Sequence, residues 1–263
     1  MVLFISLAIL INSLTYITSR FITSKGIRIV PMTSTGLGSD GPICQFRAQE
    51  RHAIYLIGGI QCRTQKPFNF ILPYAKRMGP VYLVEYRNFG LDIELAAENL
   101  RKHICENNFE KATFIAVSLG WQVASRSARP QDVVIALNPC LGYESVQQQV
   151  QKAVKLLPLG YLVSIAIGWL SYAPVVKTIG FPYSIILLLD QFACCCIRNE
   201  PNYNFDVALL VLSTKDGVIN NDYIEGQLET VAQHCYYIDT EHFGVTDNAE
   251  MYRRAVIEAL TPR

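Results

Sequence analysis

A serine lies where a predicted buried strand meets a predicted helix, in the stretch "KATFIAVSLGWQVASRSARP" at residues 111–130. A tight turn between strand and helix exposes such a side chain at the carboxyl edge of a parallel sheet, where α/β proteins form their ligand sites. The turn brings strand and helix close together and so requires small residues two positions to either side, here Ala116 and Gly120. Ser118 is therefore a candidate nucleophile, and the alternative is a serine that caps an ordinary helix.

A serine nucleophile needs a base to remove its proton and an acid to orient that base. Asp216 stands in "LSTKDGVIN" after the apolar run "VALLVL", and His242 stands in "DTEHFG" after "CYYID". Both positions predict the carboxyl edge already assigned to Ser118. The alternatives are a turn-forming aspartate and a surface imidazole. Less well placed rivals are His52, His103 and His234, and Asp190, Asp206, Asp222 and Asp239.

Stabilisation of an oxyanion requires preorganised N–H donors. The stretch "YLIGGIQCR" supplies candidates, because Gly58 and Gly59 let the backbone turn directly after a buried strand. The backbone N–H groups of Ile60 and Leu119 would be the two donors. A plain glycine-rich turn is the alternative reading of the glycine pair.

The elements that must position these residues alternate along the chain. Helical patterns occur at residues 92–107, behind an Asp92 cap, and at 224–234 and 248–260. The alternation predicts an α/β fold with a mostly parallel sheet flanked by helices, preceded by an early edge strand within residues 26–51. The apolar runs predicted as buried strands are residues 53–59, 81–86, 112–117, 133–138, 207–212 and 235–239.

Two apolar regions depart from this alternation. Residues 2–17 carry no charge and predict either a membrane anchor or a segment packed on the domain. If they span, the basic residues that follow would keep the main domain cytoplasmic. Residues 156–176 also lack charge, but lie between predicted strands of one sheet, which favours an apolar cap. We therefore expect an N-terminal segment at residues 1–25 and one domain at 26–263, with a cap insertion at about 141–205.

Composition excludes several classes of function. The 263 residues are 51% hydrophobic, and 23 basic residues nearly balance 22 acidic ones, so no nucleic-acid groove is indicated. Three of the eight cysteines are consecutive and the others are dispersed, which is no disulfide framework and suits a reducing compartment. No CxxC pair is present, so the sequence implies neither a metal nor a cofactor.

From about Ala53 to the C-terminus, the chain resembles the α/β-hydrolase family. The motifs that carry the resemblance are "LIGGI", "VEYRNFG", "AVSLG", "STKDGVI" and "TEHFG", in the family's order. Ala116 replaces a usual glycine, Gly58 a frequent histidine and Glu85 a common aspartate. The family includes esterases, lipases, thioesterases, amidases and peptidases, whereas its epoxide hydrolases and dehalogenases use an aspartate where this chain has Ser118.

These observations together predict a membrane-associated serine hydrolase of carboxylic esters, with lipid or acyl esters as substrates. Ser118 would attack, His242 would move the proton, and Asp216 would hold the imidazolium. The apolar residues of the cap would line an acyl tunnel, face a bilayer, or simply pack on the sheet. Acyl transfer or thioester cleavage by the same residues is an alternative activity, and a noncatalytic lipid-binding or interaction protein is an alternative class.

Overall fold

The computed structural model describes residues 27–32, 51–59, 65–86, 93–149, 151, 203–242, 244, 245 and 247–260. The apolar N-terminal run, Ile60, Asp92 and residues 152–202 of the predicted insertion lie outside these ranges. The division into an N-terminal segment, a domain and a cap therefore stays a prediction. Within the described ranges, no helix has both the length and the apolar composition needed to cross a bilayer.

The described strands form one sheet in the order β1-β3-β2-β4-β5-β6-β7. Strand β1 pairs antiparallel with β3, and every other neighbouring pair is parallel. The predicted mostly parallel sheet with an early edge strand is confirmed. Its strands are β1 (Ile27–Pro31), β2 (His52–Ile57), β3 (Val81–Tyr86), β4 (Lys111–Val117), β5 (Val133–Leu137), β6 (Asp206–Ser213) and β7 (Cys235–Ile238).

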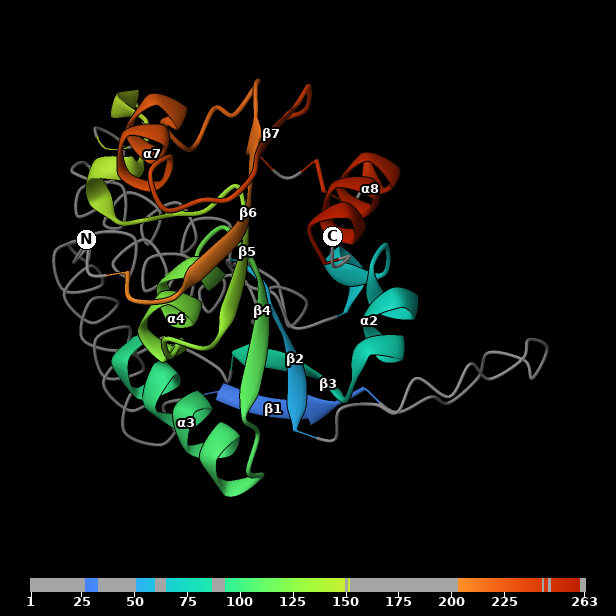
Figure 1. Cartoon of the computed structure of the whole chain (residues 1–263). Coiled ribbons are helices and arrows are strands. Elements are labelled where there is room, and N and C mark those ends of the chain that lie inside the picture. The colour runs from blue at the N-terminus through green and yellow to red at the C-terminus, as the bar shows by residue number, and fades with distance from the viewer. Residues whose placement is uncertain are drawn as a thin grey trace, which may run out of the picture.

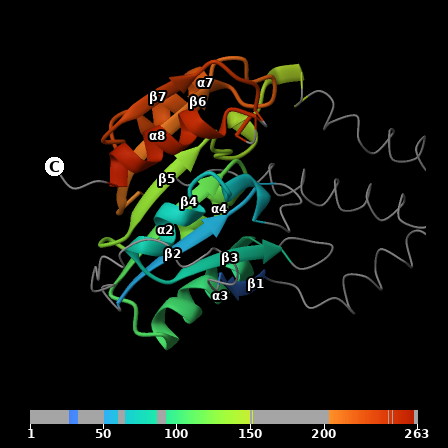
Figure 2. The same cartoon turned by 90° about the vertical axis from the view of Figure 1, so that its right-hand side faces the viewer.

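Helices cover both faces of the sheet, with α3 and α4 on one side and α2 and α8 on the other (Figures 1 and 2). Successive side chains of β2 serve opposite cores: Tyr55 packs with α3 and α4, and Leu56 packs with α2 and α8. Burial on both faces explains why the central strands read as continuous apolar runs. The helices are α2 (Leu72–Met78), α3 (Ile93–Glu106), α4 (Gly120–Ser127), α7 (Asn221–Leu228) and α8 (Ala249–Leu260), with 3-10 turns η1 (Lys66–Phe68) and η2 (Tyr143–Ser145).

The strands that precede the candidate residues are close neighbours in the sheet. Ser118 follows β4, Asp216 lies just beyond β6, and His242 lies just beyond β7. Strand β5 separates β4 from β6, and all these strands are parallel, so their carboxyl ends meet at one edge. Although about 70 residues separate β5 from β6 in sequence, the two strands are hydrogen-bonded neighbours.

Two helices differ from the expectations. Helix α7 covers Asn221–Leu228, whereas the pattern predicted residues 224–234. It starts earlier because the Asn220 side chain accepts a hydrogen bond from the Tyr223 N–H and caps it. It ends earlier because the Gln233 N–H donates to the carbonyl of Val207, beside the start of β6. The sequence patterns also gave no expectation for α2, which has proline in its first turn.

Candidate active site

Ser118 occupies a strained turn between β4 and α4. Its φ of 51° lies in the left-handed region, which is uncommon for any residue other than glycine. The Ser118 N–H donates to Leu137 O at 2.9 Å, and its carbonyl accepts from Cys140 N at 3.0 Å and Trp121 N at 3.1 Å. These bonds to the end of β5 and to α4 hold the strained conformation in place.

Two glycines allow the end of β2 to approach this turn. A Cβ atom on Gly120 would lie 2.3 Å from Ile57 O and 2.8 Å from Gly58 O, distances that real Cβ atoms do not adopt. A Cβ on Gly59 would lie 3.1 Å from the Cβ of Ser118. Gly120 therefore has to be small, as the sequence pattern required, and the glycine pair after β2 lies beside Ser118.

Ser118, His242 and Asp216 form a continuous chain of hydrogen bonds. The Ser118 Oγ lies 2.9 Å from His242 Nε2, and His242 Nδ1 lies 2.6 Å from Asp216 Oδ2. Because an ionised carboxylate only accepts, Nδ1 carries the proton and Nε2 is left to accept from the serine hydroxyl. All three residues are buried. The arrangement has the connectivity by which a base activates a serine and an acid orients the base.

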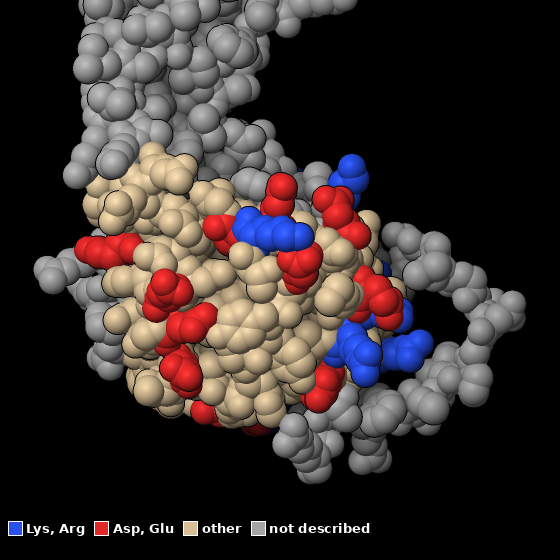
Figure 3. Space-filling model, turned by 90° about the horizontal axis from the view of Figure 1, so that it is seen from above, with Lys and Arg blue, Asp and Glu red and all other residues tan. Residues whose placement is uncertain are grey.

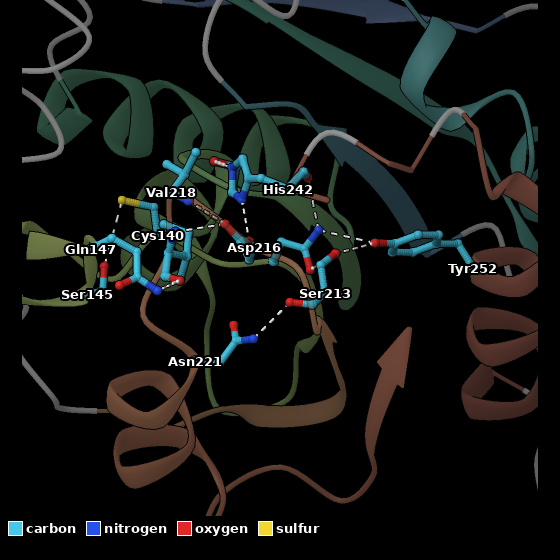
Figure 4. A network of polar contacts seen from close by, with 12 residues as sticks. Cys140, Ser145, Gln147, Ser213, Asp216, Val218, Asn221, His242 and Tyr252 are labelled. Carbon is cyan, nitrogen blue, oxygen red and sulfur yellow. Dashed lines mark hydrogen bonds and ion pairs between the residues drawn. The ribbon is translucent and has the colours of Figure 1, made fainter. Parts of the chain in front are cut away.

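The second oxygen of Asp216 fixes the carboxylate from the other side. Its Oδ1 accepts the backbone N–H groups of Val218 and Ile219, both at 2.8 Å. The loop is in turn bonded to the segment after β5, since Gln147 N–H donates to Val218 O at 2.8 Å. Figure 4 shows Asp216 between His242 and this loop. Because every oxygen of the carboxylate has a donor, its orientation toward the imidazole is defined.

The rival residues lie elsewhere. Asp239 is exposed and pairs with Lys215 Nζ at 2.9 Å. His103 lies in α3, where its Nδ1 is 2.9 Å from Tyr55 Oη, and His52 begins β2 at the opposite end of the strand. Asp206 begins β6 and Asp222 lies in the first turn of α7, His234 directly precedes β7, and Asp190 lies outside the described residues. The described chain brings only Asp216 and His242 to Ser118 among the weighed candidates.

The structure describes only one of the two predicted oxyanion donors. Leu119 is buried at the start of α4, and its N–H meets no acceptor among the described residues. Ile60 lies outside the described part of the chain. In the described ranges, His, Cys, Asp and Glu side chains form no group of three or more that could hold a metal ion.

Sequence reasoning missed a polar cluster that contacts the backbone of His242. Asn138, directly after β5, donates through Nδ2 to the carbonyl of His242 at 3.0 Å. Its amide also contacts Ser213, at the end of β6, and Tyr252, in α8. Figure 4 shows Ser213 between Asp216 and Tyr252. The one available signal was that polar Asn138 and Ser213 each end an apolar run.

Comparison with known proteins gives no matching family model and no matching curated protein. Solved structures do match. An esterase from Exiguobacterium antarcticum has a TM-score of 0.61 at 12% identity, covering 88% of this chain and 94% of that one. A carboxylesterase structure from Nitrososphaera gargenis has a TM-score of 0.59 at 15% identity, covering 88% and 93%.

A third structure, carboxylesterase CesB from Bacillus subtilis, has a TM-score of 0.53 at 12% identity and covers 96% of this chain and 98% of that one. At such low identities the likeness concerns the fold. The strand order, the strained serine turn after β4 and the positions of Asp216 and His242 after β6 and β7 agree with it. This chain therefore has the α/β-hydrolase fold.

Proposed function

We propose that the protein is a serine hydrolase that cleaves carboxylic esters through an acyl-enzyme. The observation that carries the proposal is the buried chain from Ser118 Oγ through His242 to Asp216, with links of 2.9 Å and 2.6 Å. A serine hydroxyl becomes nucleophilic when a neutral imidazole accepts its proton. A serine that only caps a helix, or a histidine at the protein surface, would require neither of these two hydrogen bonds.

The reaction follows from these atoms. Ser118 Oγ attacks the ester carbonyl while His242 Nε2 takes the hydroxyl proton, and Asp216 stabilises the imidazolium. The imidazolium gives this proton to the leaving alcohol. Water, deprotonated by the same nitrogen, then attacks the acyl-serine carbonyl. The imidazolium returns that proton to Ser118 Oγ as the bond to the acyl group breaks and the acid is released. We assign the oxyanion contacts to the N–H groups of Leu119 and Ile60. Among the described residues, the Leu119 N–H has no other acceptor.

The proposed substrates are lipid or acyl esters, and this part rests on the sequence. Residues 156–176 and 178–189 contain no charged side chain, so a cap built from them favours an apolar acyl chain. The near balance of acidic and basic residues supports a neutral substrate over a polyanion. On the described part of the face in Figure 3, acidic side chains are spread among neutral ones and basic side chains are few.

A series of p-nitrophenyl esters from acetate to palmitate tests both parts of the proposal. We expect hydrolysis that depends on Ser118 and a kcat/KM that rises with acyl length before it levels off. Hydrolysis that survives in Ser118→Ala would exclude Ser118 as nucleophile. A preference for acetate would still support hydrolase activity but would reject long-chain acyl esters as the substrates.

We also propose that residues 1–25 bind a membrane surface and leave the domain at 26–263 in the cytoplasm. The support is the uncharged run at 2–17 with basic residues on its C-terminal side. Deletion of residues 1–22 should weaken membrane binding and reduce activity on dispersed lipid more than on a short soluble ester. Equal losses on both substrates, with unchanged membrane binding, would show that the run stabilises the domain instead.

A further inference from the structure

Four buried polar groups meet at the backbone of His242. They are the side chains of Asn138, Ser213 and Tyr252 and the backbone carbonyl of His242, and the three side chains are at most 1% exposed. They come from the end of β5, the end of β6, helix α8 and the loop after β7. Figure 4 shows Ser213 and Tyr252 facing each other across this junction. The junction thus joins four separate elements of the fold.

The donors and acceptors of the three side chains close a ring. Asn138 Nδ2 donates to Tyr252 Oη at 3.1 Å, and Ser213 Oγ donates to Asn138 Oδ1 at 3.0 Å. Ser213 Oγ and Tyr252 Oη are 2.9 Å apart. Because the single proton of Ser213 is already used, Tyr252 donates to Ser213. Burial raises the pKa of Tyr252, so this hydroxyl keeps its proton.

The ring leaves one donor for the histidine loop. An amide nitrogen has two N–H groups, and the second Nδ2 proton of Asn138 points to His242 O at 3.0 Å. A backbone carbonyl only accepts, so this contact requires the nitrogen of Asn138 rather than its oxygen. The His242 carbonyl therefore sets the orientation of the amide, and the contacts with Ser213 and Tyr252 hold the side chain in place. An asparagine also suits the backbone here, since its φ of 46° is left-handed.

The backbone of the same segment supports the serine turn. Leu137 O accepts the Ser118 N–H at 2.9 Å, and Asn138 N–H donates to Val211 O at 2.8 Å. The short segment of Leu137 and Asn138, at the end of β5, therefore contacts the backbone of Ser118 on one side and that of His242 on the other. A displacement of the His242 loop relative to Ser118 requires that the Asn138 contact be broken.

We infer that Asn138 is a positioning residue, whose amide holds the His242 backbone so that Nε2 stays at hydrogen-bond distance from Ser118 Oγ. This inference rests on the proposed serine hydrolase activity. Asn138 itself does not contact the reacting hydroxyl. A misplacement of about 1 Å in a catalytic group can lower a rate by about 10²-fold, which sets the expected effect.

Two substitutions remove the contact in different ways. Asn138→Asp keeps the shape but places an acceptor against the carbonyl of His242. Asn138→Gly keeps the left-handed backbone, carries no charge and deletes the amide. If both variants show the same loss, its cause is the lost contact with the His242 backbone and not the charge that the aspartate adds. The control is Thr113→Val, which removes a buried hydroxyl 2.9 Å from His52 Nε2 near the start of β4, far from the candidate site.

The rate of Ser118 labelling by a fluorophosphonate should fall about 10²-fold in both Asn138 variants. It should stay at the wild-type value in Thr113→Val, although that variant should also unfold at a lower temperature, because it loses a buried hydrogen bond. Wild-type labelling rates in both Asn138 variants would overturn the inference. A loss in all three variants that follows only their lowered stability would overturn it as well.

The NMR signal of the His242 Nδ1 proton reports position without any reaction. It should be strongly downfield in the wild-type protein, absent in His242→Gln, and shifted or broadened in the Asn138 variants but not in Thr113→Val. If the wild-type protein is not labelled yet this signal responds as expected, the proposed activity is wrong and the positioning contact stands. An unchanged signal in both Asn138 variants refutes the contact.

Discussion

Replacement of Asp216 by asparagine should abolish nearly all turnover while the fold persists. In the wild-type structure, Oδ1 accepts two backbone N–H groups at 2.8 Å and Oδ2 faces His242 Nδ1 at 2.6 Å. The asparagine oxygen must occupy the Oδ1 position, because the opposite orientation leaves two N–H groups without an acceptor, at about 1–3 kcal/mol each. The amide NH₂ then faces Nδ1 and donates to it.

This orientation forces the imidazole into the wrong tautomer. With Nδ1 accepting, the ring proton moves to Nε2, which now donates to Ser118 Oγ and cannot take its proton. The equivalent change in a serine protease lowers kcat by about 10⁴-fold, or about 5.4 kcal/mol, and we expect a similar loss here. KM should change little, since Asp216 is shielded behind the imidazole.

The assay is steady-state hydrolysis of the best p-nitrophenyl ester, with Asp239→Asn as the matched control. That control makes the same chemical change on an exposed carboxylate bound to Lys215, and should keep wild-type activity. A kcat for Asp216→Asn within about tenfold of wild type would refute the reasoning. A large loss in Asp239→Asn would instead favour the rival acid.

Three further predictions concern stability. Gly120→Ala should cost at least about 3 kcal/mol of unfolding free energy, because the new Cβ would meet two carbonyl oxygens. Gly226→Ala, whose Cβ would have nothing within 4 Å, should instead gain about 0.5–1 kcal/mol. Urea denaturation measures both changes, and equal effects would contradict the close packing at Gly120. Burial lowers the pKa of His103, so the unfolded chain binds protons more readily and the unfolding free energy should fall as pH decreases below 6.5. His103→Gln should lose less stability over that interval than wild type, and an identical loss would show that His103 does not contribute. Asp132→Asn should cost about 3 kcal/mol in urea denaturation, since this carboxylate, 0% exposed, accepts the N–H at the start of β4 and a guanidinium; a neutral effect would mean that the ion pair is dispensable.

The strands were predictable because they are buried on both faces. In β3, the apolar run at residues 81–86 coincides with the observed strand. The strands β4, β5 and β6 differ from their runs by no more than one residue at each end. Helix α7 was mispredicted because its pattern continues into residues 229–234. There the chain pairs with the start of β6, a contact between distant residues that local periodicity does not encode.

The candidate site was predictable where each residue follows a strand. Ser118, Asp216 and His242 could be placed at one edge from the direction of parallel strands alone, and the structure links them by hydrogen bonds. The supporting residues could not. Asn138 and Tyr252 are 114 positions apart, and only the folded sheet brings the amide, the phenol and the carbonyl of the histidine loop together.

The central claim is that Ser118 is an activated nucleophile, and reaction with a fluorophosphonate followed by peptide mapping in a mass spectrometer tests it most directly. An unactivated serine does not react, whereas a serine bonded to a neutral imidazole does. We predict one adduct, on the peptide that contains Ser118, and no adduct in Ser118→Ala or His242→Ala. The claim is contradicted if the folded wild-type protein remains unmodified, or if the adduct persists in Ser118→Ala.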